Sequence, residues 1–556
     1  MRLYFLFMSM VLIVFGQVEF TSSDLPIVVI NTQGENIPPD NPRIVAAMGI
    51  IDNGRGKRNS ITDIANDYSG NIAIEIRGSS SAGWLKKSYA FETQNGDGSN
   101  RNVSLLGLPA ENDWILYAPY YDRSLIRNVL IYSLSRQMGR YASRTRFCEL
   151  VLNGTYQGIY VLMEKIKRDK NRVNIKVLNP DDISGDAVTG GYIIKIDKPG
   201  DEYFTSNYAP YRGANQSQYN RYQYHYPKDD EITTEQKRYI STYIHRFEDE
   251  IARARYADLE SEYDTYIDIE SFVDHFILNE ISKNVDGFRL SSFFYKDRGG
   301  KLYAGPIWDF NFSFGNVGYY NAWDSETWQL DDYLNFALGD QWLAPFWWYI
   351  LKEDSTFIYA LSRRWDDLKS TILNPEHIEA MIDAMVDSLA EARERNFEIW
   401  VGPGEEKPRN DRGWFPPASP IMHIHSYDDE ILFLKNWYRA RFQWMNSMIP
   451  DPPGYRLNTG RTNPEGFILM GNYPNPFNRH TIIEFKVPED GRVQLIIYDI
   501  LGKPILTLAD KYYYTGFHFE RWDGSDSQHR QVASGIYLVR VIYKNRQFTH
   551  KLIYIK

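Results

Sequence analysis

The stretch "FCELVLNGTYQGIYVLMEKI", residues 147–166, decides how the first half of the chain folds. Two apolar runs rich in β-branched and aromatic residues flank the dipeptide Asn153-Gly154. Asn-Gly readily adopts the positive backbone angles of a two-residue hairpin turn, so the stretch predicts an antiparallel β-hairpin. Cys148, the single cysteine of the chain, lies in the first run. An intrachain disulfide is therefore excluded, and we expect a buried, inert thiol.

Strand and helix patterns surround this hairpin. Four segments have apolar patterns typical of strands: "NIAIEIRG" (71–78), "GGYIIKIDK" (190–198), "SSFFYKD" (291–297) and "KLYAGPIWDF" (301–310). Helical apolar spacing occurs in "DRSLIRNVLIYSLSRQMG" (122–139), in 233–284 and in 326–450. Residues 201–232, rich in Tyr, Asn, Gln and Ser, predict a long surface excursion. The patterns together predict an α+β domain with a helical C-terminal part.

Length, charge and the N-terminus limit the class of protein. A chain of 556 residues is expected to form two or three domains. A net charge of -10 gives no overall support for a nucleic-acid partner. The apolar run within residues 3–15 is shorter than the roughly 20 residues of a membrane span and fits a signal peptide. We expect residues 1–18 to be that signal, with a retained anchor as the alternative, and no stable membrane span elsewhere.

A change of character marks a second domain. The Pro/Gly-rich segment "PDPPGYRLNTGRTNPEG" begins at Pro450 and predicts a linker at 451–467. Beyond it, residues 468–556 contain short alternating strands separated by Gly and Pro turns. This pattern predicts a small all-β, immunoglobulin-like sandwich.

A glycine- and serine-rich turn beside two lysines occurs in "RGSSSAGWLKKSY", residues 77–89. Backbone N–H groups of such a turn can cradle a phosphate, and a lysine on the next strand can reach its oxygens. The alternative is a solvated hairpin with surface lysines. Glu164, at the end of an apolar run, is either a partner for such a lysine or a strand-end surface acid.

Two acids follow apolar segments further along the chain. Asp286 lies in a turn after an amphipathic helix, where it is either a base or metal ligand or plain turn chemistry. Asp309 and Asn311 are two positions apart in "WDFNFSFGN" (308–316). On a strand they would face the same side and form a carboxylate-amide pair suited to a metal. A hairpin between Asp286 and Asp309 would bring the acids together.

These blocks, taken in order with the hairpin and with "DRSLIRN", "GGYIIKIDK" and "NVDGF", resemble the CotH (spore coat protein H) kinase family of secreted, divergent protein kinases. The resemblance covers residues 25–320. It implies an atypical protein-kinase-like fold and transfer of the ATP γ-phosphate to Ser or Thr of proteins, with Mg²⁺ or Mn²⁺. We expect a kinase domain over residues 25–450, whose part at 326–450 is either built into the kinase lobe or a separate cap.

The resemblance also implies roles on the phosphate side. Lys87 matches the phosphate-binding lysine, with Lys86 as its rival. Glu164 matches the ion-pair partner of that lysine. Arg77 and Arg127 match positions that support the phosphate side or the fold.

On the metal side, the resemblance implies that Asp286 is the catalytic acid and Asp309 the metal-binding acid. Some family members have an asparagine five residues after the catalytic acid as a second metal ligand. Here Ser291, a weaker ligand, occupies that position. Asn311 is the expected substitute.

The C-terminal segment resembles the type A sorting domain of the type IX secretion system. The matching pieces, in order, are "NPFN" (475–478), "YDILG" (498–502), "WDG" (522–524), "ASGIY" (533–537) and the basic-ended terminal strand. The resemblance implies export through the periplasm to the outer cell surface or medium, with the type IX secretion machinery as partner.

Two other functions remain open at this stage. The substitution at Ser291 favours a catalytically weak or dead kinase-like binding protein of the cell surface. A metal-dependent hydrolase using Asp286 and Asp309 is the other alternative, although only 10 histidines are present. His423 and His425 would face one way on a strand, as a metal site or as an ordinary strand end. The sequence does not identify the phosphate acceptor.

Overall fold

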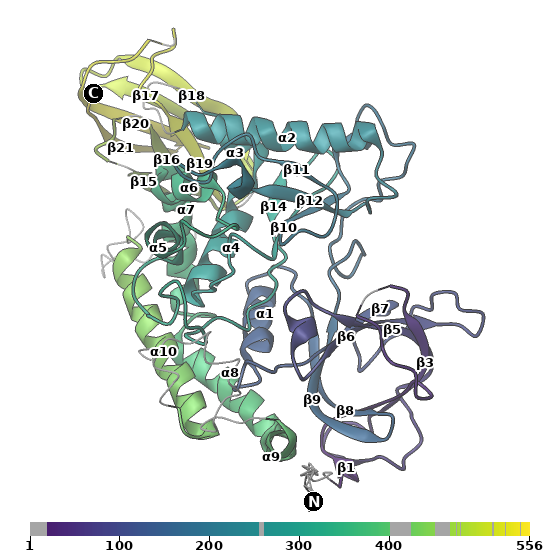
Figure 1. The fold of residues 1–556 in the computed structure, drawn as a ribbon. Helices are drawn as coiled ribbons and strands as arrows, with labels where there is room; N and C mark the ends of the chain where they lie inside the picture. Colours follow the sequence, from purple (N-terminus) through teal and green to yellow (C-terminus); the bar gives the residue numbers. More distant parts are fainter. Residues whose placement is uncertain are drawn as a thin grey trace, which may run out of the picture.

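The computed structural model (Figure 1) describes most of the chain from Glu19 to Lys556. The predicted signal peptide, the predicted linker at 451–467 and His423 lie outside the described residues. Among the described residues, no helix combines the length and apolar character needed to span a membrane. The positions not described are 1–18, 40, 255–260, 401–423, 451–467, 474, 479, 514–515, 529 and 545.

The strands predicted around the hairpin belong to a closed barrel, an arrangement that the sequence patterns did not predict. Its seven strands, in spatial order, are β2 (Ile27–Asn31), β3 (Ile44–Ile51), β5 (Tyr68–Arg77), β6 (Ser88–Gln94), β7 (Asp113–Tyr117), β9 (Thr155–Glu164) and β8 (Thr145–Leu152). The β8–β9 hairpin is confirmed: Asn153 and Gly154 have φ angles of 49° and 76° between paired strands. Cys148 is fully buried, and burial raises the pKa of its thiol to about 12. A short pair, β1 (Ser22–Ser23) and β4 (Asn59–Ser60), lies beside the barrel.

A second, antiparallel sheet has five strands. Their order is β11 (Tyr203–Thr205), β12 (Arg221–Tyr226), β10 (Tyr192–Ile196), β13 (Ser292–Lys296) and β14 (Leu302–Ala304). The predicted surface excursion at 201–232 is therefore wrong in part, because it supplies two strands. Tyr222 and Tyr224 alternate along β12 and are buried in the main core.

The strand predicted for residues 301–310 ends early. β14 stops at Ala304, because Pro306 has no backbone N–H to continue the ladder. The segment from Gly305 through "WDFN" is a loop, and Asp309 has a φ of 64°. The two-residue strand periodicity expected for Asp309 and Asn311 therefore does not apply.

Helices join the barrel to the second sheet. The predicted helix α1 (Arg127–Gln137) is confirmed, and it packs on the outer face of the barrel, where alternate residues of β9 such as Ile159 and Val161 share its core. α2 (Thr234–Arg253) and α4 (Ile269–Ile281) cover the second sheet (Figure 1). α3 (Tyr263–Tyr266) connects them.

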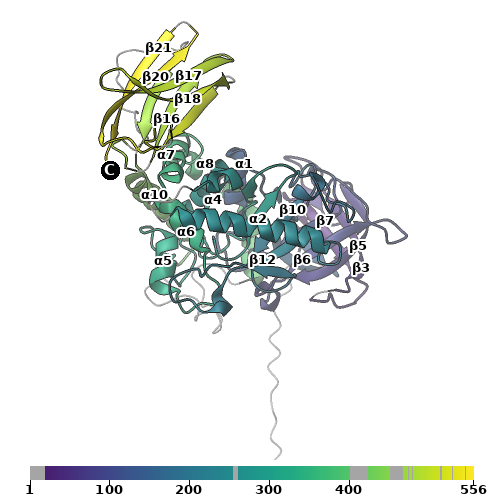
Figure 2. The same cartoon turned by 90° about the horizontal axis from the view of Figure 1, so that it is seen from above.

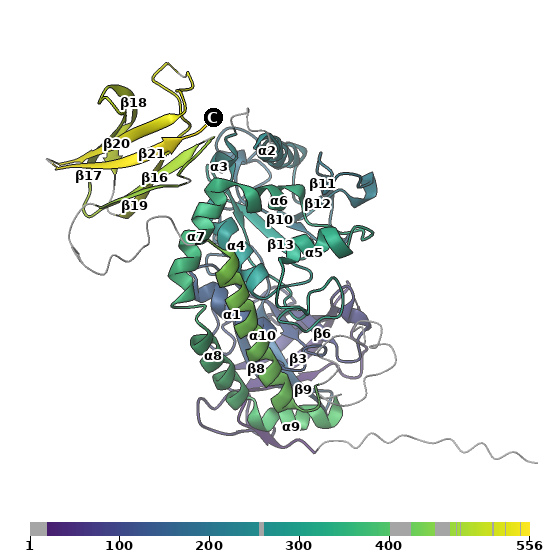
Figure 3. The ribbon, with the colours of Figure 1, turned by 90° about the vertical axis from the view of Figure 1, so that its left-hand side faces the viewer.

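The segment after residue 326 is mainly helical, as expected. It contains α5 (Gln329–Phe336), α6 (Phe346–Glu353), α7 (Ser355–Lys369), α8 (Pro375–Ser388), α9 (Ala390–Ile399) and α10 (Tyr427–Met448). Figure 3 shows α8 and α10 running alongside α1 toward the barrel, with α9 below β8 and β9. The helical part thus spans both halves of the domain.

The C-terminal domain consists of two antiparallel sheets (Figure 2). One contains β15 (Ile468–Tyr473), β16 (Thr481–Val487) and β19 (Gly516–Trp522). The other contains β18 (Pro504–Tyr513), β17 (Gly491–Asp499), β20 (Gly535–Tyr543) and β21 (Arg546–Tyr554). Phe485 of one sheet and Val541 of the other belong to one apolar core. The two sheets therefore pack face to face, as predicted for an all-β domain.

Candidate functional site

A pocket of about 590 Å³ lies where the barrel, the second sheet and the helical part meet. Its walls include the Gly/Ser turn after β5, residues of β6, β7, β9 and α1, the end of β10, the turn at 286–291, the loop at 308–312, the pair Tyr319 and Tyr320, and the turn at 340–342. The segment 326–450 therefore contributes to the same pocket as the barrel, through Asp340 and Trp342.

The loop carrying Asp309 is held from behind by α1. Tyr132 Oη accepts a hydrogen bond from the Asp309 backbone N–H at 3.0 Å, and Asn128 Oδ1 accepts one from Phe310 at 2.7 Å. Arg127 Nε donates to the Ser313 carbonyl at 3.1 Å. These contacts fix a backbone with positive φ, and the loop lines the pocket with Asp309.

Three of the four aspartates that line the pocket lie close enough together for their charges to interact. Asp309 lies near Asp286 and Asp197, and burial together with these two charges raises the pKa of Asp309 to about 7. Burial also raises the pKa of Asp197. The sequence reasoning missed Asp197, although its position directly after the buried strand β10 resembles that of Asp309 after "GPIW". Clustered carboxylates of this kind favour a bound cation.

The predicted metal-side residues share this pocket. Asn311 and Ser291 line it together with Asp286 and Asp309. The Ser291 backbone N–H hydrogen-bonds the Asp197 carboxylate. Among the described residues, no group of three or more His, Cys, Asp or Glu side chains is close enough to hold a metal by itself. A metal here would need oxygen atoms from amides, water or a ligand.

The predicted ion pair between Lys87 and Glu164 is wrong. Lys87 Nζ donates to the Ala82 carbonyl at 2.7 Å, whereas Glu164 accepts from Arg144 Nη1 at 2.7 Å and lies 3.9 Å from Arg172. The strand register places Glu164 level with Phe91. That is four residues along the sheet from Lys87, or about 13 Å.

Lys86 and Arg127, which were also predicted on the phosphate side, do not line the pocket and instead make contacts that support the fold. Lys86 is buried, and its Nζ donates to the Ile159 carbonyl at 2.7 Å and to Asn396 Oδ1 at 2.8 Å. Burial lowers the pKa of Lys86 well below its usual range. Arg127 pairs with Asp122 at 2.6 Å and with Glu430 at 2.7 Å. Lys86 therefore fastens α9 to the barrel, and Arg127 supports the fold.

Two cations on the phosphate side do line the pocket. Arg77 lies 5.2 Å from the centre of the Trp308 ring, close enough to Asp309 for their charges to interact. Lys198 Nζ donates to Ser80 Oγ at 2.8 Å, so it reaches the Gly/Ser turn that was expected to hold Lys87. The sequence reasoning identified Arg77 but missed Lys198. Its only sequence signal is a position beside Asp197 at the end of a buried strand.

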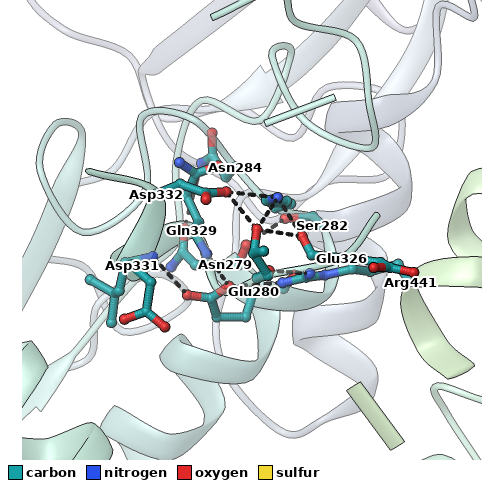
Figure 4. A network of polar contacts seen from close by, with 12 residues as sticks. Asn279, Glu280, Ser282, Asn284, Glu326, Gln329, Asp331, Asp332 and Arg441 are labelled. Atoms are coloured by element: carbon teal, nitrogen blue, oxygen red, sulfur yellow. Dashed lines mark hydrogen bonds and ion pairs between the residues drawn. The ribbon is translucent and has the colours of Figure 1, made fainter. Parts of the chain in front are cut away.

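The turn carrying Asp286 is supported by a buried polar network (Figure 4). Glu280, at the end of α4, accepts hydrogen bonds from Arg441 Nη2 and the Gln329 backbone N–H, both at 2.9 Å. Lys283 Nζ pairs with Asp332 at 2.8 Å. Because Arg441 belongs to α10, the position of the Asp286 turn depends on the last helix of the domain.

Glu164 provides a stability test of the corrected ion pair. In Glu164→Gln, Arg144 and Arg172 lose a fully buried carboxylate partner, and we expect the free energy of unfolding to fall by about 3 kcal/mol in urea titrations. The folded variant is expected to match the wild type in a Mg·ATP binding assay. A selective loss of nucleotide binding with unchanged stability would instead support the predicted role beside a phosphate-binding lysine.

Comparison with known families gives two matches. Residues 74–445 match the family model described as CotH kinase protein. Residues 472–556 match the secretion system C-terminal sorting domain, of the type IX system. The second match identifies an exported protein of the cell surface or the medium.

Likeness to solved structures is slight. The latent PorU dimer from Porphyromonas gingivalis is 20% identical over 17% of this chain and 10% of its own, with a TM-score of 0.15. The alkylpurine DNA glycosylase AlkC from Pseudomonas fluorescens, bound to DNA containing an abasic site analog, is 10% identical over 38% of this chain and 52% of its own, with a TM-score of 0.13. The chain thus spans about a tenth and about half of these proteins, and neither likeness indicates a shared overall fold. A search of the curated proteins gives no match.

Proposed function

Because the chain belongs to the CotH kinase protein family, we propose that it is an exported protein kinase that transfers the γ-phosphate of ATP to serine or threonine side chains of exported or surface proteins. The observation that supports this most directly is the pocket in which Asp197, Asp286 and Asp309 face Arg77 and Lys198. Carboxylates for a metal and a proton, opposed to cations for phosphate, are what phosphoryl transfer requires. The catalytic domain is placed at residues 25–450 and the sorting domain at 468–556.

The donor set of the pocket fits magnesium. Asp309 and Asn311 would hold the ion, with Asp197 and Ser291 beside it. Mg²⁺ prefers oxygen ligands, needs only one or two carboxylates and keeps several waters, so the small number of acids agrees with this choice. When bound, the metal neutralises charge on the transferring phosphate. Burial, and after it the charges of Asp286 and Asp197, raise the pKa of Asp309, so a cation at this position would favour its ionised form.

The phosphate chain of ATP would lie between Lys198, Arg77 and the Gly/Ser turn. Gly78 has a φ of 110°, a backbone conformation that residues with a side chain rarely adopt. Glycine therefore favours this tight turn, whose backbone N–H groups can approach phosphate oxygens. Lys198 takes the role that the sequence assigned to Lys87.

Asp286 would accept the proton of the acceptor hydroxyl. As the hydroxyl oxygen forms its bond to the γ-phosphorus, the bond from that phosphorus to the β,γ-bridging oxygen breaks, and ADP leaves. The hydroxyl proton moves to the Asp286 carboxylate. Its Oδ1 already accepts from Arg289 at 2.7 Å, so Oδ2 is the oxygen available for this transfer.

A second candidate is a kinase-like surface protein that binds nucleotide without turnover. Ser291 in place of an amide ligand, and the missing pair between Lys87 and Glu164, favour it. Incubation with labelled ATP, Mg²⁺ and a generic protein acceptor tests the choice. Transfer to the acceptor or to the chain itself supports the kinase. Metal-dependent ATP binding by calorimetry with no transfer supports the binding protein.

The Asp309 carboxyl is expected to make stability depend on pH. Its pKa is raised from 3.8 to about 7 on folding, so the folded state holds a proton that the unfolded state releases between these values. The resulting loss of stability grows as pH rises through this window and is complete above about 7. Asp309→Asn removes the ionisable group that causes this loss. Because the Asp309 side chain is only partly buried and solvent screens its charge, the substitution should stabilise the metal-free protein by about 2 kcal/mol at pH 8.

Thermal unfolding in EDTA at pH 5 and pH 8 measures this effect. We expect the gain in unfolding temperature of Asp309→Asn to be clearly larger at pH 8. An equal gain at both values, or a loss at pH 8, would mean that burial and the neighbouring carboxylates do not raise the pKa of Asp309 as described.

A further inference from the structure

The turn at residues 340–342 contacts both functional ends of the pocket. It lies between α5 and α6 and comes from a part of the chain with no recognised motif. Asp340 Oδ2 accepts from Arg289 Nη1 at 2.8 Å. The centre of the Trp342 ring lies 5.6 Å from Lys198 Nζ. One short turn therefore contacts the arginine behind Asp286 and the lysine on the phosphate side.

Arg289 transmits the first contact to Asp286. Its side chain is only 3% exposed, and its Nη2 pairs with Asp286 Oδ1 at 2.7 Å. Its Nε donates to the Val285 carbonyl at 2.8 Å, within the turn that carries Asp286. With Asp340 on one side and Asp286 on the other, the guanidinium cannot turn without breaking a charged hydrogen bond. Asp340 thereby fixes which Asp286 oxygen faces the pocket.

Trp342 restricts the second group. A lysine side chain has four rotatable bonds, and the single hydrogen bond to Ser80 Oγ leaves much of that freedom. An indole ring beneath the ammonium adds a cation–π attraction that favours one position. The ring therefore confines Lys198 to the region between the Gly/Ser turn and the carboxylates.

The turn is itself held by two buried amide side chains from the segment between β11 and β12. Gln218 Nε2 donates to the carbonyls of Leu338 and Asp340 at 2.9 and 2.7 Å. Asn220 Nδ2 donates to the Leu343 carbonyl at 2.6 Å. Within the turn, the Trp342 backbone N–H donates to Asp340 Oδ1 at 3.1 Å. The two side chains therefore project from a fixed backbone.

We propose that residues 340–342 are a positioning element that sets Asp286 relative to Lys198, and so sets the acceptor hydroxyl relative to the γ-phosphate. This inference rests on the proposed kinase function. Asp340 acts through Arg289 and Trp342 acts through Lys198, so both are positioning residues. Small displacements of two reacting groups lower the reaction rate strongly, so an element that fixes their positions is expected to raise kcat.

Two variants separate the two contacts. Asp340→Asn is expected to lower kcat roughly ten-fold while the KM for ATP and the KM for the acceptor protein stay within about two-fold. Transfer to protein should fall more than hydrolysis of ATP by water, because only the protein hydroxyl depends on an oriented Asp286. Asp331→Asn is the matched control, because Asp331 is a partly exposed acid of the neighbouring helix α5 that pairs with Lys352. Its substitution should change neither kcat nor either KM.

Trp342→Leu is expected to weaken Mg·ADP binding about three- to five-fold in calorimetry, through the lost cation–π contact. Trp342→Phe keeps an aromatic face and should restore most of the affinity. Because Mg·ADP binding needs no turnover, it tests the role of the Trp342–Lys198 contact even if the wild type transfers no phosphate. Absence of transfer in the wild type would count against the proposed function and not against this contact.

Three results would overturn the proposal. One is an unchanged kcat in Asp340→Asn when the wild type is active. Another is an effect of Asp340→Asn confined to the KM of the acceptor protein, which would make Asp340 a direct substrate contact. The third is equal Mg·ADP affinity in Trp342→Leu and the wild type.

Discussion

Asp309→Asn is expected to lower phosphate transfer by on the order of 1000-fold and to abolish tight metal binding, while the protein remains folded. The substitution keeps the shape of the side chain and removes the charge that would bind the ion. The backbone contacts from Tyr132 and Asn128 to this loop do not involve the Asp309 side chain, so they persist. Transfer from labelled ATP and Mn²⁺ titration by electron paramagnetic resonance provide the two measurements.

Asp331→Asn again serves as the control, since it removes an acid outside the pocket. Full transfer activity in Asp309→Asn would contradict the proposed metal site. Loss of transfer with unchanged Mn²⁺ binding would move the metal to Asp197 or Asp286 and leave Asp309 with another role.

The second large effect is expected for Lys198→Met, which should lower kcat/KM for ATP by about 100-fold. Methionine preserves the length and apolar stem of the side chain but cannot pair with phosphate oxygens. Lys87→Met is the matched variant, because both lysines flank the same Gly/Ser turn through contacts to Ala82 and Ser80. It is expected to change kcat/KM by less than about three-fold.

Steady-state kinetics with varied ATP, supported by calorimetry with Mg·ADP, would compare the pair. The opposite ranking, with Lys87→Met inactive and Lys198→Met active, would restore the assignment predicted from sequence and require the Gly/Ser turn to rearrange when nucleotide binds.

Local signals account for the parts of the fold that the sequence predicted. The hairpin at Asn153-Gly154 follows from the backbone freedom of two residues, and α1 follows from apolar spacing within one segment. The acids Asp286 and Asp309 were also recognisable, because each follows a clear helix or strand pattern. Such features depend on neighbours in sequence and need no knowledge of distant contacts.

Most of the errors arise where partners lie far apart in the chain. Glu164 pairs with Arg144 rather than Lys87 because of strand register in a closed barrel, which no local pattern specifies. Lys198 reaches the pocket because β10 ends there, and Asp340 because a turn 51 residues after Arg289 folds back. The strand expected through Asp309 failed for a local reason, Pro306, that the alternation of apolar residues obscured.

The network beneath Asp286 has a consequence for the order in which the chain can complete the proposed site. Every carboxylate of the proposed metal and proton site precedes residue 310, yet Glu280 obtains its arginine partner only from position 441. A chain that has folded only through its barrel and second sheet holds all three acids but lacks the buried guanidinium that anchors the end of α4. Assembly of the proposed site therefore requires nearly the whole segment that matches the kinase family, residues 74–445, and not only the part that carries the acids.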